Sequence, residues 1–251
     1  MMRMPVSVAM AVCNGERYLA AQIDTILSQL NQNDELIVSY DPSNDATLSI
    51  VKGYEAADNR VRVIYNHEHS RGLVSNFENA LKDCANEIIF YADQDDYWFS
   101  NKINRVMKEF DNPEVLVVVH DAKLTDENLH VVNESTFALR GGARDSFIGN
   151  LVRLSYIGCC MAFRKEALGY ILPLPTKGRS HDWWTGSICC CYGRMAIVDE
   201  PLILHRFHTN NATPKKRPGF RYQLVVRVTI LFNTAKRRGF AQLIRRRLSS
   251  R

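Results

Sequence analysis

Apolar, β-branched runs recur along the first half of the chain at a nearly constant interval. Five such runs occupy residues 6–13, 35–40, 61–65, 87–92 and 115–120, and their starts lie about 26 to 30 residues apart. This spacing leaves room for one helix between consecutive strands, as the crossover between parallel strands requires. It therefore predicts an α/β domain built on a mostly parallel sheet.

The segments between these runs have the apolar periodicity of helices. Three of them place apolar residues on one face: Leu19, Ile23, Ile26, Leu27 and Leu30; Leu73, Phe77, Leu81 and Cys84; and Ile103, Val106, Met107 and Phe110. Ser100 is a suitable N-cap for the third helix. Continuous apolar strands that alternate with amphipathic helices predict a sheet covered by helices on both faces.

The second half of the chain is less regular. Residues 155–168 read as a buried strand or turn followed by a helix, and residues 178–193 as a loop that enters an apolar helix. Residues 195–211 read as two short strands with a turn at Pro201. We therefore divide the chain into residues 1–120 and 121–213, two halves of one domain, and a tail over residues 214–251.

The cysteines argue against a disulfide framework or a zinc site. There are seven, an odd number, and they contain no C-x-x-C pair, so we expect small core residues in a reducing cytosol. We expect no signal peptide, because Asn14, Gly15 and Glu16 interrupt the first apolar stretch. No run of about 18 apolar residues predicts a membrane-spanning helix.

Charge is distributed unevenly over the 251 residues, whose formal net charge is +5. Residues 201–251 hold thirteen Lys and Arg and no Asp or Glu, which leaves residues 1–200 with a net charge of −8. An acidic body with a basic tail points to an anionic surface as a partner.

Polar segments follow the predicted strands at residues 14–18, 41–45, 66–72 and 93–98. The carboxyl ends of parallel strands form the ligand-binding edge of such sheets. In the last segment Asp93, Asp95 and Asp96 fall within four positions of one another. With phosphate oxygens they would make an oxygen-rich shell suited to Mg²⁺ or Mn²⁺. The alternative is a solvated acidic turn that caps the following helix.

Seven motifs in one order resemble a known family. They are "VSVAMAVCNGERYL", "ELIVSYDPSNDATLSI", "NFENAL", "ADQDDYW", "IGCCMAF", "HDWW" and "HRFHTNN". Over about residues 5–213 the chain resembles the family 2 glycosyltransferases, inverting enzymes of the Rossmann-like GT-A fold. It is most similar to bacterial members of O-antigen and surface-polysaccharide synthesis, including rhamnosyl- and glucosyltransferase-like proteins.

The resemblance implies roles for residues on the donor side. Glu16 would be a polar contact in the nucleotide pocket, and Asp41 would bond the base. Asp93 would reach the ribose or base side, and Asp95 would bind the metal, Mn²⁺ or Mg²⁺. Asp96 would support this turn or contact the donor sugar.

Further roles follow for the second half of the chain. Asp182 takes the place of the catalytic base, and His208 would close the metal shell or hold the diphosphate with the help of Arg206. Of Trp183 and Trp184, we expect one to stack on a sugar and one to lie in the core.

Arg71 could salt-bridge a phosphate, the alternative being a surface residue. The family's usual "DDGS" is here residues 40–43, "YDPS", and its "YRQH" is "HRFH". These departures leave the base specificity open.

The basic tail interleaves Lys and Arg with apolar residues, and its apolar residues fit helical faces. These faces hold Leu224, Val228, Leu231 and Phe232, and then Phe240, Leu243, Ile244 and Leu248. This pattern is typical of a basic amphipathic helix on an anionic membrane surface. The alternative is that the tail packs on the acidic body, and a nucleic-acid role lacks a motif.

Together these features predict a metal-dependent, inverting glycosyltransferase on the cytoplasmic face of the plasma membrane. It would transfer a sugar from a nucleoside-diphosphate sugar to a hydroxyl of a lipid-linked glycan. The alternatives are a sugar nucleotidyltransferase, although "CNGERY" is not its Gly-rich loop, and a non-catalytic nucleotide-sugar-binding protein. The sequence leaves open the donor sugar and nucleotide, the acceptor, the linkage and the oligomeric state.

Overall fold

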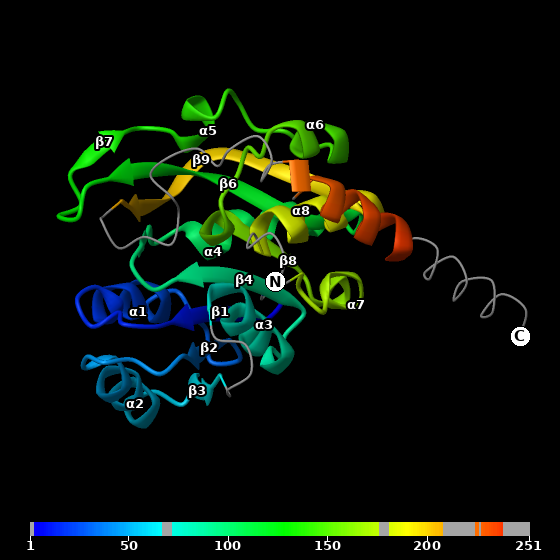
Figure 1. The fold of residues 1–251 in the computed structure, drawn as a ribbon. Helices are drawn as coiled ribbons and strands as arrows, with labels where there is room; N and C mark the ends of the chain where they lie inside the picture. The colour runs from blue at the N-terminus through cyan, green and yellow to red at the C-terminus, as the bar shows by residue number, and fades with distance from the viewer. Residues whose placement is uncertain (1–2, 67–71, 176–180, 208–223, 226, 238–251) are drawn as a thin grey trace, which may run out of the picture.

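One nine-stranded sheet runs through the protein, as the computed structural model shows (Figure 1). The structure describes residues 3–66, 72–175, 181–207, 224–225 and 227–237. Within these residues the strand order is β3-β2-β1-β4-β8-β6-β9-β5, and β7 pairs with β6. The strands are β1 (Val6–Val12), β2 (Glu35–Tyr40), β3 (Val61–Tyr65), β4 (Ile88–Asp93), β5 (Tyr97–Trp98), β6 (Val115–Thr125), β7 (Val131–Asn133), β8 (Met161–Arg164) and β9 (Arg194–Arg206).

The five strands predicted from apolar runs are all present, as β1, β2, β3, β4 and β6. β1 pairs in parallel with β2 and β4, and β2 pairs in parallel with β3. The second half of the chain adds β8, which lies antiparallel between β4 and β6. The carboxyl ends of β1, β2 and β4 therefore share one edge of the sheet, the edge predicted to carry the ligand.

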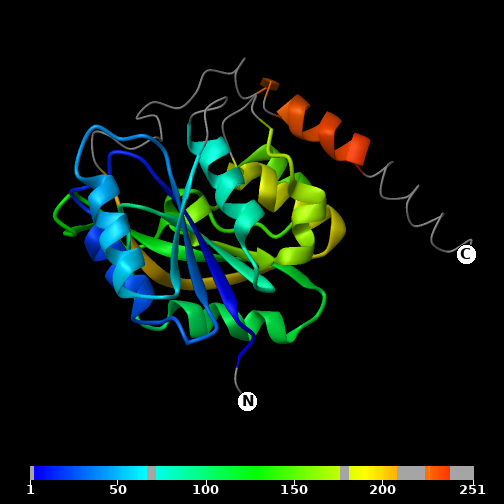
Figure 2. The same ribbon diagram turned by 90° about the horizontal axis from the view of Figure 1, so that it is seen from below.

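Helices cover both faces of the sheet, as predicted (Figures 1 and 2). Three helices pack on the face to which Val8 and Met10 point: α1 (Leu19–Leu27), α2 (Thr47–Ala57) and α4 (Lys102–Met107). Three others pack on the opposite face with Ala9 and Ala11: α3 (Leu73–Asp83), α7 (Leu168–Ile171) and α8 (His181–Tyr192). Since successive strand residues point to opposite faces, a strand that is apolar throughout contributes side chains to the core on both faces of the sheet.

Short elements complete the chain. They are α5 (Thr136–Leu139), α6 (Phe147–Val152) and the 3₁₀ turns η1 (Lys108–Asp111), η2 (Gly158–Cys160) and η3 (Lys165–Ala167). Residues 224–225 and 227–237 are helical and are called the C-terminal helix below. Among the described residues, no helix has both the length and the apolar character to cross a membrane.

Two local predictions were wrong. Residues 195–206 do not form two strands, because β9 continues through Pro201 and the pairing with β6 shifts register there. Proline lacks the N–H that a regular ladder needs, so the irregularity falls at this position. Asn101, not Ser100, precedes α4, and its side chain makes no capping hydrogen bond. The predicted helix with Leu73, Phe77 and Leu81 is present as α3, and Leu73 is 39% exposed because it begins this helix at the edge of the core.

The cysteines are free thiols in the structure. Four of them, Cys84, Cys159, Cys160 and Cys189, are buried, as expected of small core residues. Cys13 is exposed and directly follows β1, at the edge predicted to carry the ligand.

Candidate functional site

The three aspartates lie in a tight turn between β4 and the short edge strand β5. Asp93 is the last residue of β4 and pairs with Ala11 of β1. Gln94 fixes the turn to β1, because its amide accepts from the Cys13 N–H and donates to the Cys13 carbonyl, both at 2.9 Å. The Gln22 amide of α1 donates to the Asp93 carbonyl at 2.9 Å. The acidic turn is therefore held at the carboxyl ends of β1 and β4.

Asp96 is buried and forms an ion pair with His205. The Nδ1–H of His205 donates to the Oδ1 of Asp96 at 2.8 Å. Burial opposes a charge on His205, but the Asp96 carboxylate outweighs this effect and raises the pKa of His205 to about 9. Burial also opposes the charge on Asp96, yet His205 holds the pKa of Asp96 below its ordinary value. The pair is charged at neutral pH.

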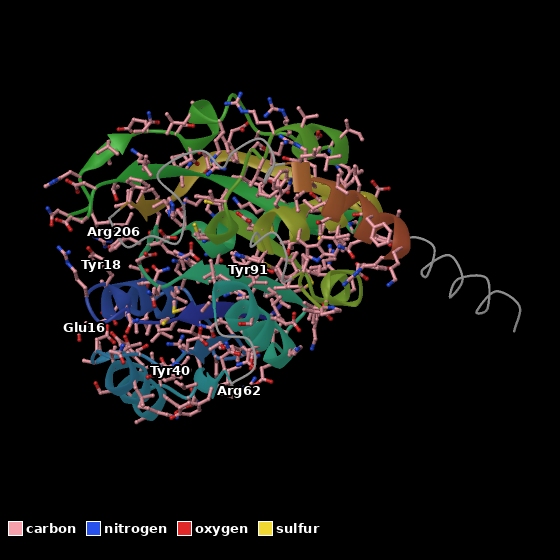
Figure 3. The ribbon with its side chains drawn as sticks, viewed as in Figure 1. Glu16, Tyr18, Tyr40, Arg62, Tyr91 and Arg206 are labelled. Carbon is pink, nitrogen blue, oxygen red and sulfur yellow. The ribbon has the colours of Figure 1, made fainter. Side chains whose placement is uncertain are left out.

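Arg206 ties the same turn to other parts of the site. Its Nε–H donates to the Asp95 carbonyl at 2.9 Å, and its backbone N–H donates to Asp96 Oδ1 at 3.4 Å. The guanidinium also lies 4.3 Å above the ring of Tyr18 and donates to the Glu127 carbonyl. Figure 3 shows Glu16, Tyr18 and Arg206 at the same end of the molecule. In the structure Arg206 is thus buried and supports the acidic turn.

Several carboxyl groups crowd this turn. The pKa of Asp93 lies well above its ordinary value because of burial and of the charges of Asp96 and Asp95. Within the described part of the chain, Oδ2 of Asp96 is buried and has no hydrogen-bond partner. Repulsion among carboxylates and a buried acceptor without a donor are both relieved by a cation. These residues therefore fit a divalent metal ion.

A second set of donor atoms overlaps the turn. Ligand atoms of Asp93, Asp96, Cys159 and His205 all lie within 4.8 Å of one another. Thiolate and imidazole ligands suit softer ions than Mg²⁺, whereas the carboxylates suit Mg²⁺ or Mn²⁺. Since His205 is already paired with Asp96, the carboxylate oxygens are the atoms of this group that best suit a cation. The metal role predicted for Asp95 stays a prediction, and His208 lies outside the described residues.

Lys102 lies fully buried beneath the turn. Its ammonium donates to the Cys159 carbonyl at 2.8 Å and lies 3.6 Å from the centre of the Trp98 ring. Burial lowers the pKa of Lys102 to about 8, although nearby anionic groups oppose the shift. Neither Lys102 nor His205 could be found from periodicity, because a charged residue in a helix or strand is ordinarily exposed.

Asp182 lies in the first turn of α8, where the sequence predicted the catalytic base. Its Oδ1 accepts from the Trp183 N–H at 2.7 Å. Its negative charge contributes to the raised pKa of Asp93, so the two carboxylates lie within electrostatic range. The side chain is half-buried.

Gly158 allows the first turn of α8 to approach η2. A Cβ atom at Gly158 would lie 2.5 Å from Nε2 of His181 and 3.3 Å from Cβ of Asp182. The imidazole of His181 is buried and stacks on Phe77, with ring centres 4.2 Å apart. Burial lowers the pKa of His181, so it is a neutral packing residue that fixes the direction of α8.

The nucleotide-side predictions fall on residues that hold loops together. Asp41, at the end of β2, accepts from the Asn66 amide at 2.6 Å and from the Gly72 N–H at 3.2 Å. Oε2 of Glu16 accepts from the Ala46 N–H at 2.7 Å, at the beginning of α2. Their contacts with a nucleotide stay predictions, and Arg71 lies outside the described residues.

The two tryptophans differ as expected. Trp184 is buried in the core, and its indole N–H donates to the Ile171 carbonyl at 2.8 Å. Trp183 is half-buried, and its indole N–H donates to the Asn150 carbonyl at 2.9 Å. Only Trp183 of the two could present a ring face to a ligand, and stacking on a sugar stays a prediction.

The chain is similar in sequence and fold to known proteins. The model of glycosyl transferase family 2 matches residues 7–172. An uncharacterized glycosyltransferase of Nostoc sp. is 24% identical over 219 residues, which are 83% of this chain and 66% of the relative. The Escherichia coli UDP-Glc:alpha-D-GlcNAc-diphosphoundecaprenol beta-1,3-glucosyltransferase WfgD is 35% identical over 98 residues, 39% of this chain and 38% of that protein.

Among solved structures, the mannosyltransferase PcManGT of Pyrobaculum calidifontis, in complex with GDP-Man and Mn²⁺, matches with a TM-score of 0.66. The match is 20% identical and covers 98% of this chain and 65% of that one. The chain thus spans about two thirds or less of the length of these relatives. Because the family model matches more than half of the residues, the chain belongs to glycosyl transferase family 2.

Proposed function

We propose that this protein is an inverting, divalent-metal-dependent glycosyltransferase that uses a nucleoside-diphosphate sugar. The observation that carries the proposal is the turn with Asp93, Asp95 and Asp96 at the carboxyl ends of β1 and β4. Its crowded carboxyl groups and the buried Oδ2 of Asp96 fit a divalent cation, and a cation there can bind a diphosphate. Family membership and the nucleotide-sugar complex of the mannosyltransferase support this reading.

The donor side of the proposed reaction uses the acidic turn. Asp95 would hold Mn²⁺ or Mg²⁺, whose charge would stabilise the departing nucleoside diphosphate. Asp93 would face the ribose or base, and Asp96 would keep the turn in place through His205. Asp41 and Glu16 line the adjacent loops, where the nucleotide would lie. His208 remains a candidate contact of the metal or the diphosphate, and Arg71 and Arg206 remain candidate contacts of the phosphates.

The acceptor side of the proposed reaction centres on Asp182. An inverting transfer is a single displacement, in which an acceptor hydroxyl attacks the anomeric carbon opposite the leaving group. Asp182 would accept the hydroxyl proton as the new bond forms. The N-terminus of α8 favours negative charge, and the Trp183 N–H orients the carboxylate. Trp183 would offer a ring face to the sugar.

The proposed acceptor is a lipid-linked glycan of a bacterial surface polysaccharide. Its support is the similarity to WfgD, whose name gives an acceptor linked to diphosphoundecaprenol. The thirteen basic residues of positions 201–251 support work at the anionic, cytoplasmic face of the plasma membrane.

A screen of nucleotide sugars with Mn²⁺ tests the proposal, with release of nucleoside diphosphate as the readout. We expect one donor to be turned over, the activity to disappear with a chelator, and Asp182→Ala to lower it by about 10²- to 10⁴-fold. Asp199→Ala, at an exposed acid of β9 away from the turn, is the matched control and should be fully active.

Three outcomes would contradict the proposal or a part of it. Release of pyrophosphate instead of nucleoside diphosphate would indicate a sugar nucleotidyltransferase. Tight donor binding without turnover, for any donor and acceptor, would indicate a non-catalytic nucleotide-sugar-binding protein. Full activity of Asp182→Ala would overturn the assignment of the base.

A further inference from the structure

The C-terminal helix packs on the body with its arginine-bearing face and leaves its apolar face exposed. Ile230 and Thr234 are buried, at 3% and 5% exposure, and lie on the same side as Arg227 and Arg237. Five apolar side chains on the other side are 44% to 69% exposed: Leu224, Val225, Val228, Leu231 and Phe232. A helix that packs only to bury its apolar face would show the reverse arrangement.

The two arginines hold the helix in this orientation. Arg227 donates to the carbonyls of Leu151 and Val152 at 2.9 and 2.8 Å, which joins the helix to the end of α6. Arg237 donates to the carbonyls of Leu172 and Pro173 at 2.8 and 2.9 Å, beyond the end of α7. Since carbonyls at helix ends lack partners within their helix, these guanidinium contacts satisfy groups that would otherwise need water.

Helix α6 extends the exposed apolar face. Ile148 and Val152 lie one turn apart on α6 and are 64% and 65% exposed. Figure 1 shows α6 next to the C-terminal helix, and the contacts of Arg227 confirm that they are neighbours. We call these seven side chains the apolar face. Exposed apolar side chains gathered on two neighbouring helices indicate an interaction site.

The positive charge near the apolar face indicates what kind of partner it binds. Residues 238–251, which follow the C-terminal helix directly, contain five arginines and no acid, and Lys236 is exposed beside the apolar side chains. Apolar side chains flanked by cations are typical of helices that lie in the interface of an anionic bilayer. An apolar protein partner would account for the apolar residues but not for the absence of acids over residues 201–251.

We propose that the apolar face, formed by the C-terminal helix and α6, docks on an anionic lipid bilayer with the helix axis in the plane of the interface. The helix touches α8 as well, because Arg227 and Arg237 lie 5.8 and 5.0 Å from the rings of Trp183 and Trp184. Asp182 lies in the first turn of α8, so docking sets the position of the proposed base relative to the membrane. The inference deepens the proposed function, because a lipid-linked acceptor would be presented at that surface.

The test is flotation of the full chain with vesicles of phosphatidylcholine, with and without about one third phosphatidylglycerol. We expect binding to the anionic vesicles, at least tenfold weaker binding to the neutral ones, and weaker binding at high salt. Leu231→Ser combined with Phe232→Ser should lower binding to the anionic vesicles at least tenfold. Both side chains are exposed, so the fold should be unaffected. Val131→Ser combined with Val132→Ser, at exposed positions of β7, is the matched control and should bind like wild type.

Several results would overturn the inference. One is that wild type does not bind the anionic vesicles, and another is that wild type and the Leu231→Ser, Phe232→Ser variant bind them equally. A third is a concentration-dependent dimer of wild type that this variant abolishes. The last would assign the face to a second copy of the chain. Donor hydrolysis in solution, measured on the same samples, separates this inference from the proposed function. It should be equal in wild type and both variants, and its absence with intact vesicle binding would contradict only the catalytic proposal.

Discussion

Replacing His205 by Gln tests the buried ion pair beneath the acidic turn. The pKa of His205 is raised from 6.5 to about 9, chiefly because the attraction of Asp96 outweighs the effect of burial. A raised pKa in the folded state adds stability that is fully present below about pH 6.5 and is lost as the pH rises through about 9. A shift of this size corresponds to about 3 kcal/mol of unfolding free energy. Gln keeps a hydrogen-bond donor but carries no charge.

The assay is urea denaturation of wild type and His205→Gln between pH 6 and pH 9.5, with a chelator present. We expect the variant to be less stable at pH 6 by about 3 kcal/mol, and the difference to shrink to about 1 kcal/mol or less at pH 9.5. Lys102 titrates in both proteins, so its contribution cancels in the difference between the unfolding free energies of wild type and His205→Gln. His130→Gln, at a largely exposed histidine that pairs with Asp126, is the control and should change stability by less than about 0.5 kcal/mol.

A difference between wild type and His205→Gln that stays constant across this pH range would refute the reasoning. It would mean that His205 contributes packing and a neutral hydrogen bond, without a charge. A variant as stable as wild type at pH 6 would refute it more directly, because a buried Asp96 would then need no partner.

Three further outcomes follow from the same contacts. Burial lowers the pKa of Lys102 to about 8, so its charge destabilises the folded state at neutral pH, and the stability of wild type should increase as the pH rises from about 8 to 10.5. Lys102→Met should therefore raise the unfolding free energy by up to about 3 kcal/mol at pH 7, and urea denaturation should show a smaller increase of stability with pH in this variant. Gly158→Ala places a methyl group against His181, so it should lower the unfolding free energy by about 1–3 kcal/mol, measured by thermal unfolding, and should also lower turnover. Gly53→Ala, in an open position of α2, is the control and should be neutral or stabilising. Asp95→Asn should raise the Mn²⁺ concentration needed for half-maximal turnover at least tenfold, and an unchanged Mn²⁺ requirement would exclude Asp95 as a metal ligand.

The candidate site divides into residues that the sequence could indicate and residues that it could not. Asp93, Asp95 and Asp96 stand out because three acids follow a buried strand, and such clustering is readable without coordinates. His205 lies in the motif "HRFH", yet its partner Asp96 is 109 positions away in the chain. Nothing in local spacing reports a contact of this kind. The inward direction of Arg227 and Arg237 was also hidden, since a helical pattern shows which residues share a face but not which face meets the body.

The sequence by itself determined the alternation of strands and helices, the two-sided burial of the sheet and the edge at which the ligand would lie. These follow from periodicity and from backbone geometry, which act over a few residues. Only the tertiary structure decided that β8 enters antiparallel between β4 and β6, that β9 continues through Pro201, and that His205 closes on the acidic turn. Those outcomes depend on which distant segments exclude water from one another, and the free energy of burying a charge depends on all of its neighbours at once.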